Sequence, residues 1–234
     1  AVAQKVAAKC YLPTNALLSE LLEKCEPFKV AFSFSGTVLE QLERYMPKAL
    51  ESFQALVKTG KVEVLAETYY HSLASLYSPL EFAEQVQLHT QKVQELFGVT
   101  PRVFRNTELI YNNAIARSVY ELGFSIMLAE GWDHYLQWRS PNFVYHAKDL
   151  PDMKVLLKNY KLSDDVAFRF SQRSWKEWPL TSEKFAQWVH AANGNGQCVN
   201  LFMDYETFGE HQWQETGIFD FLRAVPFEVL KHPD

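Results

Sequence analysis

The sequence has few of the residues that define several protein classes. It contains only three cysteines, Cys10, Cys25 and Cys198, without a Cys-x-x-Cys pair. This argues against a disulfide framework and a thiolate zinc site, and it favours a reducing cytoplasm. No apolar run reaches the ~20 residues that cross a bilayer, and the N-terminus lacks a signal-peptide pattern. We therefore expect no membrane partner.

Basic clusters and phosphate-binding turns are missing as well. The 23 Lys and Arg residues face 28 Asp and Glu residues, for a formal net charge of −5, and no basic run is long enough to follow a phosphate backbone. Nucleic acid is thus not expected as a partner. The 234 residues are 47% hydrophobic and 22% charged, which is typical of one folded domain with its own core.

Helical and strand-like patterns alternate along the chain. Such alternation predicts parallel strands joined by right-handed crossovers, hence an α/β barrel or a doubly wound sheet. No strand-to-helix junction contains the glycine-rich turn of a dinucleotide fold, which favours the barrel. We expect helices over residues 14–25, 38–58, 81–97, 112–122 and 181–192, strands over 28–34, 62–66, 102–105, 125–129 and 198–203, and strand-like pieces at 143–146 and 154–160.

Both ends of the sequence resemble the ends of a truncated chain. Residues 1–9 already have a helical pattern, no initiator Met is present, and another helix begins near Thr216. We expect a chain trimmed at both ends, with residues 1–215 as a barrel that lacks its first strand and residues 216–234 as the start of a helical region.

Residue types used in catalysis follow several predicted strands. In a β/α barrel the loops after the strands meet on one rim and form the active site. The candidates are Glu67 and His71 after the second strand, Glu108 after the third, Trp132 and Asp133 after the fourth, and Asp204, Glu206 and His211 after the last.

Glu108 and Asp204 are the leading catalytic candidates because each follows an apolar strand. Glu108 suits a nucleophile or base, and Asp204 suits a proton donor. The alternatives are a solvated residue at a helix N-terminus for Glu108 and a helix cap for Asp204. If the two face each other at roughly 5 to 5.5 Å, they form the pair of a retaining glycosidase.

Aromatic and histidine residues around the same rim allow two interpretations each. The aromatic side chains could stack on sugar rings or simply pack. The histidines and acids could bind a metal, but no tight His-x-x-x-His spacing supports this, so hydrogen bonding is favoured. The aromatic set is Tyr69, Tyr70, Trp132, Tyr135, Trp138, Trp175, Trp178 and Tyr205; the metal set is His71, His134, His211, Asp133 and Asp204; and Asp164–Asp165 is expected in a loop.

Three segments resemble motifs of glycoside hydrolase family 57, the α-amylase and 4-α-glucanotransferase family. Residues 60–63 with 69–71 (GKVE and YYH) resemble its second motif, 104–111 (FRNTELIY) its third, and 203–211 (MDYETFGEH) its fourth. The resemblance implies a (β/α)7 barrel with Glu108 as nucleophile and Asp204 as acid/base. It also implies supporting or substrate-site roles for Glu67, His71, Glu206 and His211. The family's first motif is absent, and its fifth is not recognisable.

Together these features predict a retaining glycoside hydrolase that acts on α-1,4-glucans or maltooligosaccharides and needs no cofactor or metal. Trp132 and Asp133 are added to its substrate-binding residues. The alternatives are a 4-α-glucanotransferase with the same residues, a metal-dependent carbohydrate hydrolase or deacetylase, and an inactive glucan-binding protein.

Overall fold

The computed structural model describes residues 2–232. Short strands alternate with helices along the chain, as the sequence predicts. The strands are β1 (Val30–Phe32), β2 (Val62–Val64), β3 (Val103–Arg105), β4 (Ile126–Ala129), β5 (Tyr145–Ala147) and β6 (Leu150–Leu157). The α-helices are α1 (Val2–Val6), α2 (Leu12–Lys24), α3 (Gly36–Tyr45), α4 (Pro47–Lys58), α5 (Ala74–Tyr77), α6 (Pro79–Phe97), α7 (Asn113–Glu121), α8 (Asp133–Leu136), α9 (Tyr160–Ala167), α10 (Ser182–His190) and α11 (Ile218–Leu230).

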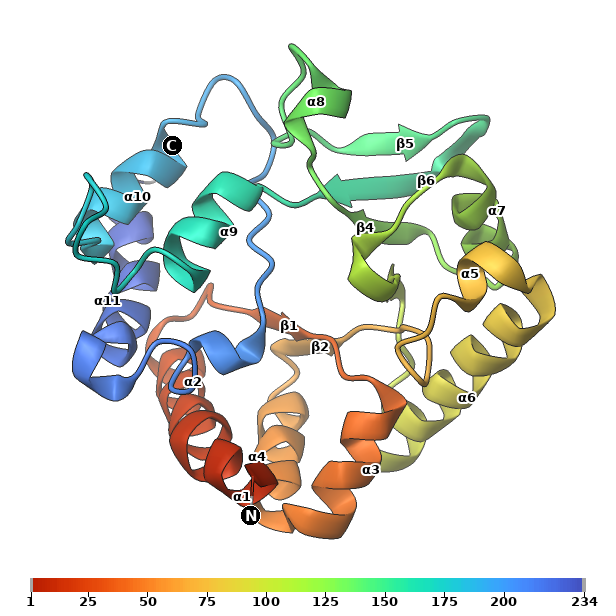
Figure 1. Cartoon of the computed structure of the whole chain (residues 1–234), viewed down its shortest axis with the longest axis horizontal. Coiled ribbons are helices and arrows are strands. Elements are labelled where there is room, and N and C mark those ends of the chain that lie inside the picture. Colours follow the sequence, from red (N-terminus) through yellow and green to blue (C-terminus); the bar gives the residue numbers. More distant parts are fainter. Residues whose placement is uncertain (1, 233–234) are drawn as a thin grey trace.

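The strands form two sheets, and isolated β-bridges add further pairing at their ends. β1 pairs with β2 in parallel, and a second sheet has the order β3-β4-β6-β5, in which only β5 is antiparallel. A parallel bridge between Ala66 and Phe104 connects the end of β2 to β3, and another connects Lys158 to Asn200. The helices lie around the outside of this arrangement (Figure 1). The parallel α/β fold is as predicted, whereas the count of seven strands stays a prediction.

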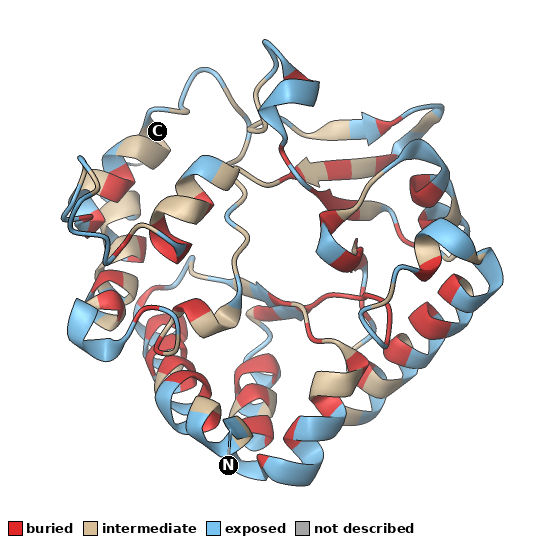
Figure 2. Ribbon diagram, viewed as in Figure 1, coloured by how far each residue is buried: buried red, intermediate tan, exposed pale blue. Residues whose placement is uncertain are grey.

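Two main apolar clusters hold the strands against the outer helices. Phe53 and Leu39, on α4 and α3, pack with Phe32 of β1 in the first cluster, and Phe104 of β3 packs with Met127 of β4 in the second. Buried residues accordingly line the sides of the helices that face the strands (Figure 2). These clusters fix where each strand ends, and so where each following loop begins.

Three local predictions are wrong. The helix expected over 38–58 is two helices, because Pro47 has no N–H to continue α3 and instead begins α4. The strand expected over 198–203 is absent apart from the bridge at Asn200. Asp164–Asp165 lies in helix α9, which Asn159 caps through its side chain, rather than in a loop.

A helix lies at or near each end of the described chain. Residues 2–6 form α1 and residues 7–11 form the π-helix η1 (Ala7–Tyr11), as the pattern over 1–9 indicates apart from Ala1, which lies outside the described residues. Helix α11 begins after Gly217, whose φ of +84° is a conformation that glycine adopts without strain. Among residues 2–232, no helix combines the length and the apolar composition needed to cross a membrane.

Candidate active site

Glu108 lies in a tight turn directly after β3. The turn is the 3-10 helix η2 (Thr107–Leu109), and both Glu108 and Leu109 have left-handed φ angles, +53° and +55°. Asn106 holds the turn together, because its side-chain amide donates to the Ile110 carbonyl at 3.0 Å. The Glu108 side chain is consequently presented outward and is 73% exposed.

His71 reaches the Glu108 carboxylate from the loop after β2. Its Nε2 lies 2.9 Å from Oε1 of Glu108, and its Nδ1 lies 3.5 Å from Oε1 of Glu67. The imidazole therefore bridges an exposed carboxylate and a buried one. Its own backbone is left-handed, with a φ of +51°.

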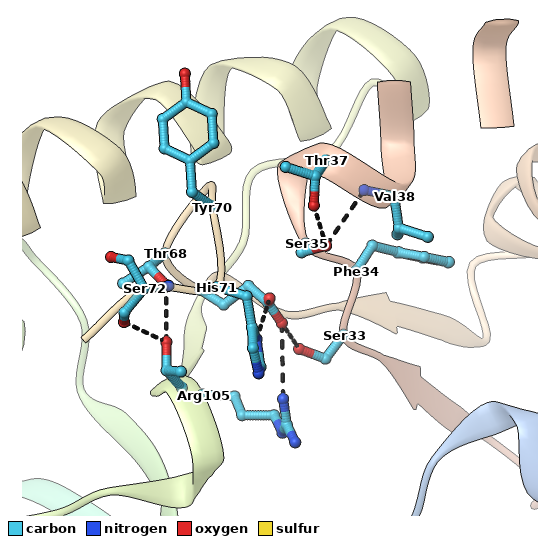
Figure 3. Close-up of polar contacts among 12 residues, drawn as sticks. Ser33, Phe34, Ser35, Thr37, Val38, Thr68, Tyr70, His71, Ser72 and Arg105 are labelled. Atoms are coloured by element: carbon cyan, nitrogen blue, oxygen red, sulfur yellow. Dashed lines mark hydrogen bonds and ion pairs between the residues drawn. The ribbon is translucent and has the colours of Figure 1, made fainter. Parts of the chain in front are cut away.

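Glu67 is the buried end of this chain of contacts. Its second oxygen accepts a hydrogen bond from the Ser33 hydroxyl and lies 3.8 Å from a guanidinium nitrogen of Arg105. Ser33 follows β1 and Arg105 ends β3, so three neighbouring strand ends converge on one carboxylate (Figure 3). Sequence reasoning missed Ser33, whose only signal is its place directly after a strand.

The charges in this cluster support one another. Burial by itself raises the pKa of the Glu67 carboxyl, but the hydrogen bonds from His71 and Ser33 and the charge of Arg105 together hold it below its ordinary 4.5. Hydrogen bonding to Glu67 is the largest cause that raises the pKa of His71 to about 9, and Glu108 adds to it. Glu67 is thus ionised and His71 protonated at neutral pH.

His89 supports Glu67 from below and was also missed. It is fully buried on α6; the Glu67 backbone N–H donates to its Nδ1 at 3.4 Å, and its Nε2 lies 2.6 Å from the Phe34 carbonyl. Burial lowers the pKa of His89, so the ring is neutral, with its proton on Nε2. The signal that the sequence offers for His89 is its place on the apolar face of a helix, which indicates a core residue but not a contact with Glu67.

Asp204 lies in a different setting. It precedes the 3-10 helix η3 (Tyr205–Thr207), is exposed, and among residues 2–232 its carboxylate makes no hydrogen bond or ion pair. The residues after it are well anchored: Glu206 accepts a hydrogen bond from the Tyr11 hydroxyl at 2.6 Å, and the Tyr205 carbonyl lies 3.2 Å from Cys10 Sγ. His211 at the end of this segment is exposed.

Tyr205 places the Asp204 segment beside the end of β1. Its ring packs edge-on against Phe32, with ring centroids 5.4 Å apart, and Phe32 is the residue before Ser33. The Glu108 cluster and the Asp204 segment therefore both adjoin this strand end.

Trp132 and Asp133 lie on the loop that contains α8. Asp133 contacts Lys161 at 2.7 Å and the Tyr160 hydroxyl at 2.9 Å, and the Trp132 ring packs on His134. No interaction within residues 2–232 joins this group to Glu67, His71 and Glu108. The proposed aromatic set is split: Trp132, Tyr135, Trp138, Tyr70 and Trp178 are exposed, Tyr69 is buried, and Trp175 and Tyr205 are partly buried.

Lys158, directly after β6, is a further charged residue that the sequence analysis did not single out. Its ammonium lies 3.9 Å from Glu130 and 3.6 Å from Asp164. Within the described residues, no three His, Cys, Asp or Glu side chains are arranged to hold a metal ion. The five residues considered as metal ligands thus do not gather into one donor set there.

Comparison with known proteins identifies the family of the chain. The sequence model of "Glycosyl hydrolase family 57" matches residues 2–233. A protein of Methanocaldococcus jannaschii named "Putative alpha-amylase" is 51% identical over 232 residues, which cover 99% of this chain and 49% of the relative. The chain thus spans about half the length of this relative and less of the other curated relatives.

Solved structures share the fold. The 4-alpha-glucanotransferase from Thermococcus litoralis superposes with a TM-score of 0.77 at 19% identity, covering 96% of this chain and 35% of that one. The GH57-type branching enzyme from Pyrococcus horikoshii superposes with a TM-score of 0.75 at 16% identity, covering 94% and 61%. At this identity the likeness concerns the fold alone, whereas the sequence model covers nearly the whole chain. The chain belongs to glycosyl hydrolase family 57.

Proposed function

We propose that the protein is a retaining enzyme that acts on α-1,4-glucans, with Glu108 as nucleophile and Asp204 as acid/base. The observation that supports it best is the contact of His71 with Glu108 at 2.9 Å, which leaves this carboxylate exposed yet oriented. A nucleophile needs both properties, since it must reach the anomeric carbon in a fixed direction.

In the first step a carboxylate oxygen of Glu108 attacks the anomeric carbon of an α-linked glucose. The bond to the glycosidic oxygen breaks, and Asp204 gives its proton to that oxygen. The product is a β-linked glucosyl ester of Glu108 and a free sugar with a new hydroxyl group. Asp204 is exposed, and among residues 2–232 its carboxyl has no ion-pair partner, so no salt bridge has to break when it gives up or takes a proton.

In the second step Asp204 takes a proton from an acceptor hydroxyl, which attacks the same carbon and releases Glu108. Two inversions give net retention. With water as acceptor the enzyme is amylase-like. We favour this reaction because the 51% identical relative is named "Putative alpha-amylase". A sugar as acceptor makes it a glucanotransferase, as in the name of the structural neighbour from Thermococcus litoralis.

The remaining predicted site residues keep supporting roles in this proposal. We propose that Trp132, Asp133, Glu206 and His211 border the glucan, with Glu206 oriented by Tyr11. We also propose the (β/α)7 barrel as the complete scaffold. No cofactor or metal takes part in the proposed steps.

The test is product release from maltoheptaose by the wild-type protein and by Glu108→Gln and Asp204→Asn, all with EDTA present. We expect each variant to lose at least about 10³-fold in rate while staying folded. Glu121→Gln on α7 and Asp152→Asn on β6, both exposed, are the matched controls and should keep full activity. Glucose and short maltooligosaccharides alone indicate hydrolysis, whereas longer products indicate transfer.

Three results would overturn the proposal. Activity that survives in either Glu108→Gln or Asp204→Asn would remove that residue from the chemistry. Wild-type activity that disappears with EDTA and returns with added metal would support the metal-dependent alternative. Binding of maltoheptaose without any turnover would support the glucan-binding alternative.

A further inference from the structure

We propose that Glu67 and His71 form a positioning pair: the buried carboxylate of Glu67 anchors the imidazole of His71, and His71 in turn orients the carboxylate of Glu108. This inference rests on the proposed function, because it assigns Glu108 the attacking role. It gives Glu67 a task other than substrate contact, since Glu67 is only 2% exposed.

The anchor is rigid because every side of Glu67 is occupied. One oxygen faces His71, the other receives the Ser33 hydroxyl and faces Arg105, and the backbone N–H donates to His89. These partners come from segments after β1 and β2, from β3 and from α6. A carboxylate held from three segments, on a backbone held by a fourth, has little freedom to rotate, so it transmits a defined position to the imidazole.

Glu108 needs this support more than a carboxylate in a regular element would. Its backbone and that of Leu109 are left-handed, and its side chain projects from the turn into solvent. Within residues 2–232, His71 is the sole partner of its carboxylate. Without that hydrogen bond the side chain would sample several rotamers, most of which point away from an anomeric carbon.

Charge strengthens the contact at working pH. The groups that face the His71 ring are the carboxylates of Glu67 and Glu108 and, on the far side of Glu67, the guanidinium of Arg105. The two acids outweigh burial and the charge of Arg105, which both lower this pKa, so the pKa of His71 is about 9 and the ring is an imidazolium at neutral pH. In Glu67→Gln the amide keeps an acceptor oxygen but loses the charge, so this pKa should fall toward its ordinary 6.5.

The first experiment follows the His71 ring nitrogens by NMR across pH 5 to 10, in the wild-type protein and in Glu67→Gln. We expect a midpoint near 9 in the wild type and a lower one, by at least about one pH unit, in the variant. Glu63→Gln is the matched control: it is an exposed glutamate on β2, four residues earlier, and should leave the midpoint unchanged.

The second experiment measures turnover of α-maltosyl fluoride, whose fluoride leaves without a proton from Asp204, so that the titration of Asp204 does not mask that of His71. For His71→Ala we expect kcat to fall about 10- to 100-fold with little change in KM, the effect of losing one charged hydrogen bond. His71→Gln places an amide donor at a similar reach and should restore part of kcat. The basic limb of the kcat profile should move to lower pH in Glu67→Gln.

Several outcomes would overturn the positioning pair. A wild-type His71 that titrates near 6.5 would do so without any variant, even if Glu67→Gln failed to fold. So would a His71→Ala protein with wild-type kcat, or an unmoved His71 midpoint in folded Glu67→Gln. The NMR titration needs no turnover, so an inactive protein with the expected titration would reject the proposed function and leave the contact between Glu67 and His71 intact.

Discussion

Glu108 and Asp204 occupy opposite settings although each follows an apolar run in the sequence. Glu108 is held by His71, which is held by the buried Glu67, so the support extends into the core. Asp204 is exposed, and its carboxylate has no partner among residues 2–232. The residues after it are anchored, since Tyr11 donates a hydrogen bond to Glu206. The first setting restricts motion, and the second leaves a carboxyl free to exchange a proton.

This difference matches the different demands on the two proposed roles. A nucleophile stays ionised and must aim at one atom, so fixed hydrogen bonds help it. An acid/base residue changes charge twice in each cycle, and a permanent cation beside it would oppose the protonated form.

The largest expected effect comes from breaking the anchor of the Asp204 segment. Gly209 has a φ of +112°, and a Cβ there would lie 2.0 Å from the Lys9 carbonyl oxygen in η1. Gly209→Ala should therefore lower the free energy of unfolding by about 3–5 kcal/mol, from backbone strain and a clash with main chain. Urea denaturation monitored by circular dichroism measures this loss.

Gly60→Ala is the matched control for that substitution. Gly60 also has a left-handed φ, +72°, but no atom of residues 2–232 lies within 4 Å of the position that a Cβ would take there, so only the backbone strain of about 1–2 kcal/mol applies. Equal losses in the two variants would show that the close approach of Gly209 to Lys9 does not anchor the segment.

A smaller effect is expected on the Glu108 side from Ser33→Ala. This change removes one hydrogen bond to Glu67 and should cost about 1 kcal/mol at neutral pH. The pKa of Glu67 lies below its ordinary 4.5, so its contribution to stability is present above that pH and is lost as pH falls through the folded-state value. In Ser33→Ala the folded-state pKa of Glu67 should rise toward 4.5. The variant should therefore lose less unfolding free energy than the wild type when the pH is lowered.

Urea denaturation of both proteins at several pH values between 3 and 7 measures that difference. The gap between wild type and Ser33→Ala should be widest at neutral pH and should narrow in acid, because protonated Glu67 no longer gains from the missing donor. A gap that stays constant with pH would mean that Ser33 acts by packing and not through the Glu67 charge.

The sequence predicted most elements of the fold because their patterns are local. The stripe of Leu17, Leu18, Leu21 and Leu22 is sufficient for α2, and Gly98 ends α6 as expected. Residues 198–203 were assigned a strand because of their apolar run, but an apolar run alone does not show whether a neighbouring strand pairs with it, and only Asn200 bridges to Lys158.

The candidate site was predictable only in part for a similar reason. Motif spacing placed Glu67, His71 and Glu108 in adjacent loops, and the structure brings these three together. The contributions of Ser33 and His89 depend on which side chains the packing of α6 and β1 turns toward Glu67, and no local pattern contains that information. The partner of Glu206, Tyr11, lies 195 positions away in the sequence.

The most direct test of the two roles uses azide as a small external nucleophile with α-maltosyl fluoride. In Asp204→Ala, azide should attack the ester of Glu108 and give the α-linked glycosyl azide, with retained configuration. In Glu108→Gly, azide should occupy the vacated place, attack the sugar directly and give the β-linked azide. We predict that NMR of the glycosyl azides will show the α anomer from Asp204→Ala and the β anomer from Glu108→Gly. The same anomer from both variants, or rescue of neither variant by azide, would contradict the assignment of nucleophile and acid/base.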